Sequence, residues 1–108
     1  MRRPILPGDV STVARALLAA PCGQRGAVLT AIFEGAQAAL ELDRRAGCLH
    51  PEWGNGGLEA AARRYALADE PTFDHTDYLC CTIMVLLEME RRLAMAGGVG
   101  CAEDPQKP

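Results

Sequence analysis

Apolar residues recur at intervals of three and four along most of the chain, which is the spacing of one face of an α-helix. The first such segment, residues 10–20, follows Asp9, a residue able to cap free backbone amides, and ends before Pro21. Its apolar positions are Val10, Val13, Ala14, Leu17 and Leu18. A longer helix follows and stops at Gly47, with the stripe Leu29, Ile32, Phe33, Ala36 and Leu40.

Small residues inside this second helix, among them Gly26 and Gly35, predict close packing against another helix. A third, short helix is expected over residues 57–68, with the inward positions Leu58, Ala61, Ala62 and Tyr65. The segment "DEPT" then breaks the pattern.

The fourth helix has the strongest start signal in the chain. Asp74 is placed to cap it, and Phe73 is placed to pack on Tyr78 as a hydrophobic staple. The helix should run from about His75 to Ala96, where two glycines stop it.

From residue 78 to residue 87 this helix reads "YLCCTIMVLL", in which Thr82 is the only clearly polar residue. A helix that is apolar around its whole circumference must be covered on every side. Two short helices and one long one cover only part of it, so a second copy is expected to cover the rest. The predicted dimer seam is Tyr78, Leu79, Thr82, Ile83, Leu86, Met89 and Leu93.

Composition agrees with an all-α fold. Apolar residues make up 49 % of the 108 residues but aromatic residues only 5 %, which is typical of helical cores. The length fits a single domain, residues 1–108, with residues 1–8 and 98–108 expected to be flexible. We therefore predict a single-domain bundle of two long and two short helices with the last long helix at its centre.

Several functional classes are disfavoured. A net charge of -3 provides no general attraction for nucleic acid. Pro4, Pro7 and Asp9 interrupt what would otherwise resemble a secretory signal, and the longest apolar run is well short of the roughly 20 residues that a membrane helix needs. A cytoplasmic protein without membrane association is expected. The five cysteines contain no C-x-x-C pair and are expected to be reduced and individually buried.

The stretch "CLHPEWGNGGL", residues 48–58, is the main candidate for a binding loop. Its candidate ligand- or partner-binding residues are His50, Glu52, Trp53 and Asn55, joined by His75 from the segment "FDHTD". A structural connector is the competing interpretation for the loop, and helix capping for "FDHTD". If the two histidines converge, they would form a metal or acid/base site. No complete set of metal ligands or catalytic residues is recognisable, so no cofactor is predicted.

Three arginine pairs occur at residues 44–45, 63–64 and 91–92. Near the ends of helices such cations offset the exposed carbonyl groups. Lined up on one edge, they would offer a surface for an acidic partner or a nucleic-acid backbone, which we consider the less favoured interpretation.

The segments "HPEWGNGGL" and "DYLCC", together with the later "VLLEMERR", resemble small uncharacterised helical proteins of alphaproteobacteria that are known as a domain of unknown function. The resemblance covers most of residues 3–95 and implies no activity. The leading functional hypothesis is a non-enzymatic interaction or regulatory module that forms a homodimer through its last helix, with another protein as a possible partner. The alternatives are a small metal- or ligand-binding protein or enzyme, and a helical nucleic-acid binder.

Overall fold

The computed structural model describes residues 4–97 of the chain, and the side chains of residues 4–95. The α-helices in this range are α1 (Pro7–Ala19), α2 (Arg25–Ala46), α3 (Leu58–Ala62) and α4 (Thr76–Gly97), and a 3-10 turn, η1 (Cys22–Gln24), precedes α2. No strand forms within residues 4–97, so the predicted all-α fold with two long and two short helices is confirmed. The predicted flexible ends include residues 1–3 and 98–108, which lie outside the described residues.

Helix α1 starts three residues earlier than the pattern predicts. Pro7 is its first residue, where a missing N–H costs nothing. Asp9 therefore lies in the first turn instead of at the cap, and its carboxylate accepts a hydrogen bond of 2.8 Å from the backbone N–H of Leu6. The preceding Ile5 packs against the core.

Helix α2 ends where the sequence predicts. Gly47 adopts a left-handed conformation with φ of 68°, and its N–H donates to the carbonyl of Asp43. A side chain would be strained at this φ, which explains why glycine ends the helix here.

Helix α3 is much shorter than predicted. It ends after Ala62, and Tyr65 closes a tighter turn onto the carbonyl of Ala62 instead of continuing the helix. The chain then runs alongside α1, where Ala68 and Arg15 exchange two hydrogen bonds: the Ala68 N–H donates to the Arg15 carbonyl, and Arg15 Nε donates to the Ala68 carbonyl. These long-range bonds outweigh the helix propensity of "AARRYALA".

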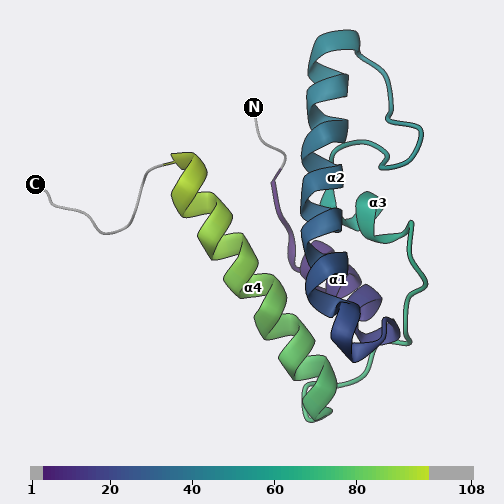
Figure 1. Cartoon of the computed structure of the whole chain (residues 1–108), viewed down its shortest axis with the longest axis vertical. Helices are drawn as coiled ribbons and strands as arrows, with labels where there is room; N and C mark the ends of the chain where they lie inside the picture. Colours follow the sequence, from purple (N-terminus) through teal and green to yellow (C-terminus); the bar gives the residue numbers. More distant parts are fainter. Residues whose placement is uncertain (1–3, 98–108) are drawn as a thin grey trace, which may run out of the picture.

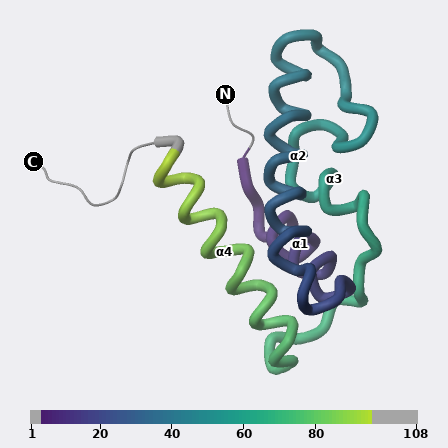
Figure 2. The backbone as a smooth tube through the Cα atoms, viewed as in Figure 1, coloured from purple at the N-terminus to yellow at the C-terminus, as the bar shows by residue number. Residues whose placement is uncertain are grey.

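Helix α1 is the centre of the molecule, because it contacts α2, α3 and α4, whereas α4 packs chiefly against α1. This differs from the expectation that α4 is central. Figure 1 shows α2 and α4 close together at one end of the molecule and far apart at the other, and the same divergence is visible in the backbone trace of Figure 2. The core consists of Val13, Ala14, Ala16, Leu17, Leu29, Ile32, Phe33, Ala36, Leu58, Ala61, Ala62, Tyr78, Cys81 and Val85.

Arg25, at the start of α2, links helices α1, α2 and α4 where α2 and α4 lie close together. Its Nε donates to the carbonyl of Leu17 at the end of α1, at 2.9 Å. Its guanidinium also lies 3.7 Å from the carboxylate of Asp77 at the start of α4. One largely buried cation thus links the beginning of α2 to both neighbouring helices.

Candidate functional site

Helix α4 buries only one of its faces. Tyr78, Cys81, Thr82 and Val85 are buried. The opposite face remains open, and there 47 % of Leu86 and 59 % of Leu87 are exposed. We call this open surface the outer face of α4; it consists of Leu79, Ile83, Leu86, Leu87 and Leu93.

The structure divides the predicted seam between these two faces. Leu79, Ile83, Leu86 and Leu93 belong to the outer face and are accessible. Tyr78 and Thr82 are buried within the chain, so they are unavailable to a partner, and Met89 packs against the core. The sequence could not make this division, because both faces of α4 are apolar.

The outer face has the spacing of a coiled-coil seam. Leu79, Ile83, Leu86, Glu90 and Leu93 follow one another at alternating intervals of four and three residues. If Ile83 is assigned to an a position of the heptad, Leu79, Leu86 and Leu93 occupy d positions, as in the apolar seam of a coiled coil. Glu90 falls on the remaining a position and is the one charged residue in the stripe.

Tyr78 is the largest of the fully buried side chains, and the ring of Phe73 stacks on it with a centroid distance of 5.5 Å. The predicted staple is therefore present. The Tyr78 hydroxyl has no hydrogen-bond partner among the described residues. Burial, and secondly the negative charge of Glu70, raise the pKa of this hydroxyl.

The last turns of α4 carry a cluster of charges around Glu88. Its carboxylate accepts hydrogen bonds from Arg91, at 2.7 Å, and from Arg92, at 2.5 Å. The bond from Arg91, with a further contribution from Arg92, lowers the pKa of Glu88 against the opposing effect of burial. Arg92 also lies over the ring of Phe33, 5.3 Å from its centroid, and 3.9 Å from the carboxylate of Glu34.

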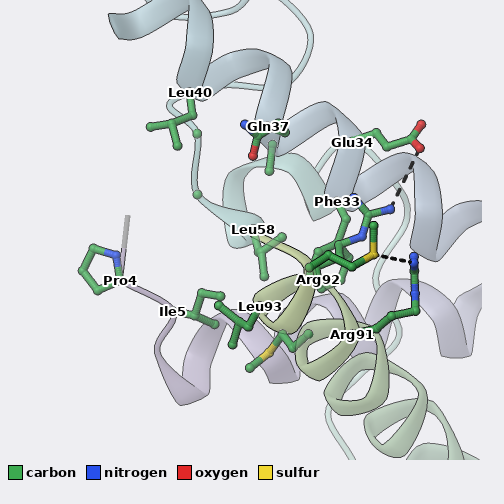
Figure 3. A pocket seen from close by; sticks show the side chains of 15 residues that line it. Pro4, Ile5, Phe33, Glu34, Gln37, Leu40, Leu58, Arg91, Arg92 and Leu93 are labelled. Carbon is green, nitrogen blue, oxygen red and sulfur yellow. Dashed lines mark hydrogen bonds and ion pairs between the residues drawn. The ribbon is translucent and has the colours of Figure 1, made fainter. Parts of the chain in front are cut away.

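Where α2 and α4 diverge, a groove of about 620 Å³ opens between them. Figure 3 shows Phe33, Gln37 and Leu40 entering it from α2, and Arg91, Arg92 and Leu93 from α4. The N-terminal segment and the start of α3 close its base. Sequence reasoning missed this groove, since its lining comes from segments that only the tertiary fold brings together.

The loop of residues 48–58 is built as a packed turn. His50 and Gly54 exchange two backbone hydrogen bonds, and His50 Nδ1 accepts bonds from the N–H groups of Glu52 and Trp53. Asn55 Oδ1 accepts a bond from the N–H of Gly57. His50 Nδ1 is therefore already hydrogen-bonded within the loop, as expected if the loop is a structural connector.

Trp53 folds back over α2 at Gly35. A Cβ on Gly35 would lie 2.2 Å from the indole, so only glycine leaves room for it. Arg64 stacks over the indole at 5.0 Å, and Tyr65 lies 6.4 Å from it between ring centroids. At Gly35 the expectation of helix-on-helix packing is therefore wrong, because an aromatic side chain fills the space.

His75 takes the capping role that we expected for Asp74. Its carbonyl accepts the first bond of α4, from the Leu79 N–H, and its Nδ1 accepts a bond of 3.2 Å from the Tyr78 N–H. Asp74 instead accepts a hydrogen bond from Thr72 within the preceding turn. That bond, above all, lowers the pKa of Asp74.

The two histidines are not brought together. The loop after α2 and the start of α4 lie at opposite ends of the molecule (Figure 1). Across residues 4–97 no group of three or more His, Cys, Asp and Glu side chains is arranged to hold a metal ion. Among the cysteines in that range only Cys81 is buried, whereas Cys22, Cys48 and Cys80 are exposed, so the expectation of buried thiols is wrong for those three.

The arginine pairs do not form one row of cations without acidic partners. Arg63 pairs with Glu59, while Arg91 and Arg92 pair with Glu88. The remaining pair, at residues 44–45, lies in the last turn of α2. In the described part of the chain, no helix has both the length and the apolar character needed to cross a membrane.

Residues 4–97 form a small all-helical domain with an open apolar helix face and a groove beside it. The chain belongs to the family described as domain of unknown function DUF7742, whose family model matches residues 3–89. Comparison with curated proteins and with solved structures gave no match.

Proposed function

We propose that this domain is a non-enzymatic interaction module that pairs with a second copy of itself through the outer face of α4. The observation that carries the proposal is the exposure of Leu79, Ile83, Leu86, Leu87 and Leu93 on one continuous helix face. Contiguous apolar surfaces of this kind usually mark sites of association.

A second copy of the chain is the partner that the pattern favours. The alternating spacing of four and three residues is that of helices packed side by side in a coiled coil. A second copy supplies the same stripe, so each leucine finds an apolar counterpart.

Glu90 sets the orientation of this pairing. In a parallel, in-register pair the two Glu90 carboxylates would lie against each other, and like charges at such a position destabilise the pair. An antiparallel pair places each Glu90 opposite a different residue. We therefore propose an antiparallel arrangement of the two α4 helices.

The test is the solution mass by light scattering, with and without reductant, over a concentration series that reaches about 1 μM. The expected result is twice the mass of the chain in both conditions. Leu86→Glu should give a monomer, because a carboxylate would be buried in the seam.

Leu49→Glu is the matched control, since Leu49 is also an exposed leucine but lies outside α4. It should leave the mass unchanged. A wild-type protein that is monomeric throughout, or a Leu86→Glu variant that still forms the dimer, would refute the proposal. A dimer that disappears with reductant would point instead to the exposed Cys22, Cys48 or Cys80.

A further inference from the structure

The groove between α2 and α4 shares Leu93 with the outer face but is otherwise lined by different residues, and it has the features of a ligand site. Its volume of about 620 Å³ lies within the range of roughly 300–1,000 Å³ that is usual for small-molecule pockets. It is open along one side, so an elongated ligand can enter without a rearrangement of the helices.

The walls of the groove are apolar over most of their length. Phe33 and Leu40 contribute from α2, Leu58 from the start of α3, and Met89 from α4. Phe33 and Leu58 are nearly fully buried, while Leu40 and Met89 are half-buried. Arg92 lies over the ring of Phe33, and the rest of this set is apolar, which suits a hydrocarbon chain with a polar end at Arg92.

Two arginines line the α4 side of the groove. Arg91 and Arg92 both donate to the carboxylate of Glu88. Glu34 also lines the groove, 3.9 Å from Arg92, and Arg91 donates to the sulfur of Met95. Each guanidinium carries five N–H donors, more than these groups accept from the two arginines, which leaves donors for an anion.

A narrow ligand fits the groove well. A flexible alkyl chain has a much smaller cross-section than an α-helix, which is about 10–12 Å wide with its side chains. Such a chain can follow the groove from Leu40 to Met89.

We propose that this groove binds an amphiphile with one alkyl chain and an anionic head, of the fatty-acid class. The chain lies along Phe33, Leu40, Leu58 and Met89, and the head accepts hydrogen bonds from Arg91 and Arg92. This site does not depend on the proposed self-association.

The test uses dodecanoate, at concentrations below micelle formation, as the probe for calorimetry and for methyl NMR of the full chain. We expect saturable binding of one molecule per chain, with shifts at the methyl groups of Leu40 and Met89. The cationic amphiphile dodecyltrimethylammonium should bind at least about tenfold more weakly, as expected for the loss of one charge-assisted contact.

Two variants locate the site. Arg91→Glu reverses the charge of a half-exposed arginine and should weaken dodecanoate at least about tenfold, whereas Arg63→Glu, at an exposed arginine outside the groove lining, should not. Gln37→Trp places a large side chain in the groove and should abolish binding. Ala38→Trp, at the neighbouring exposed position of α2 outside the lining, should leave it intact.

Absence of saturable binding would overturn the proposal, as would equal affinity for the cationic amphiphile or indifference to both groove variants. If dodecanoate fails to bind and Gln37→Trp changes the mass of the assembly, the groove belongs to a second copy of the chain. Repeating the titration with Leu86→Glu keeps the two proposals separate, since the groove should still bind dodecanoate when the outer face is disrupted.

Discussion

The indole of Trp53 lies on α2 at Gly35, a position where the helix has no side chain, and Arg64 and Tyr65 pack around it. The ring therefore anchors the loop of residues 48–58 to α2. This contact gives the single tryptophan of the chain a structural role and makes it a sensitive reporter of the α2–α3 region.

Gly35→Ala should lower the free energy of unfolding by about 1–3 kcal/mol, since the new methyl group would overlap the indole ring. Urea unfolding followed by tryptophan fluorescence measures the effect, and the native emission should shift towards that of exposed tryptophan. Gly26→Ala is the control, because nothing lies within 4 Å of that position, and it should gain up to about 1 kcal/mol. Equal stability of the two variants would disprove the packing argument.

The buried hydroxyl of Tyr78 gives a second prediction. Since it has no hydrogen-bond partner among the described residues, Tyr78→Phe should leave the free energy of unfolding unchanged or raise it by up to about 1 kcal/mol. Tyr78→Ala should cost about 3–5 kcal/mol, because a large core side chain is lost. Urea titrations of both variants decide the matter, and a clear loss of stability in Tyr78→Phe would reveal a hydrogen bond to the hydroxyl.

Glu88 gives a pH-dependent prediction. Its pKa is lowered below the usual value near 4.5 by Arg91 and Arg92, so its contribution to stability is complete above that value and is lost as the pH falls through the lowered pKa. Glu88→Gln should therefore cost up to about 1 kcal/mol at neutral pH and nothing in strong acid. Chemical unfolding at several pH values measures this. A pH-independent loss in Glu88→Gln would contradict the assignment.

At the scale of the elements, α1 and α3 begin at one shared group. One oxygen of Asp9 accepts the N–H of Leu6 at the start of α1, and the other accepts the N–H of Glu59 in the first turn of α3, at 3.0 Å. The five-residue α3 is too short to be stable by itself, so an anchor supplied by another helix accounts for its presence.

Asp9→Ala should lower the free energy of unfolding by about 1–2 kcal/mol, because two backbone N–H groups lose their acceptor. Hydrogen exchange at the amide of Glu59 should accelerate along with this loss. Ser11→Ala removes a single exposed hydrogen bond in the same turn and should cost much less. An unchanged exchange rate at Glu59 in Asp9→Ala would show that the two helices are not coupled through this carboxylate.

For the molecule as a whole, the central position of α1 leaves one apolar face of α4 uncovered. If a second copy covers that face, unfolding and dissociation are linked, and stability depends on protein concentration.

The thermal midpoint of the wild type should therefore rise between about 1 and 100 μM protein, while that of Leu86→Glu should stay constant. Differential scanning calorimetry at several concentrations measures both. A wild-type midpoint that does not depend on concentration would mean that the outer face remains uncovered in the folded protein.

The sequence by itself determined the features that depend on near neighbours. The intervals between apolar residues located both long helices, Gly47 ended α2 because it accepts a left-handed conformation, and Phe73 was correctly placed against Tyr78. The predicted length of α3 was wrong, because its end depends on the hydrogen bonds between Ala68 and Arg15, which are 53 residues apart.

Only the tertiary structure decided which face of α4 is buried, where Trp53 packs, and that a groove opens beside Arg91. A helix that is apolar all round carries no periodic signal that distinguishes its faces, so the choice depends on the surface that α1 presents to it. The outer face and the groove both include the part of α4 that α1 does not cover. Interactions between residues close in sequence do not determine which part that is.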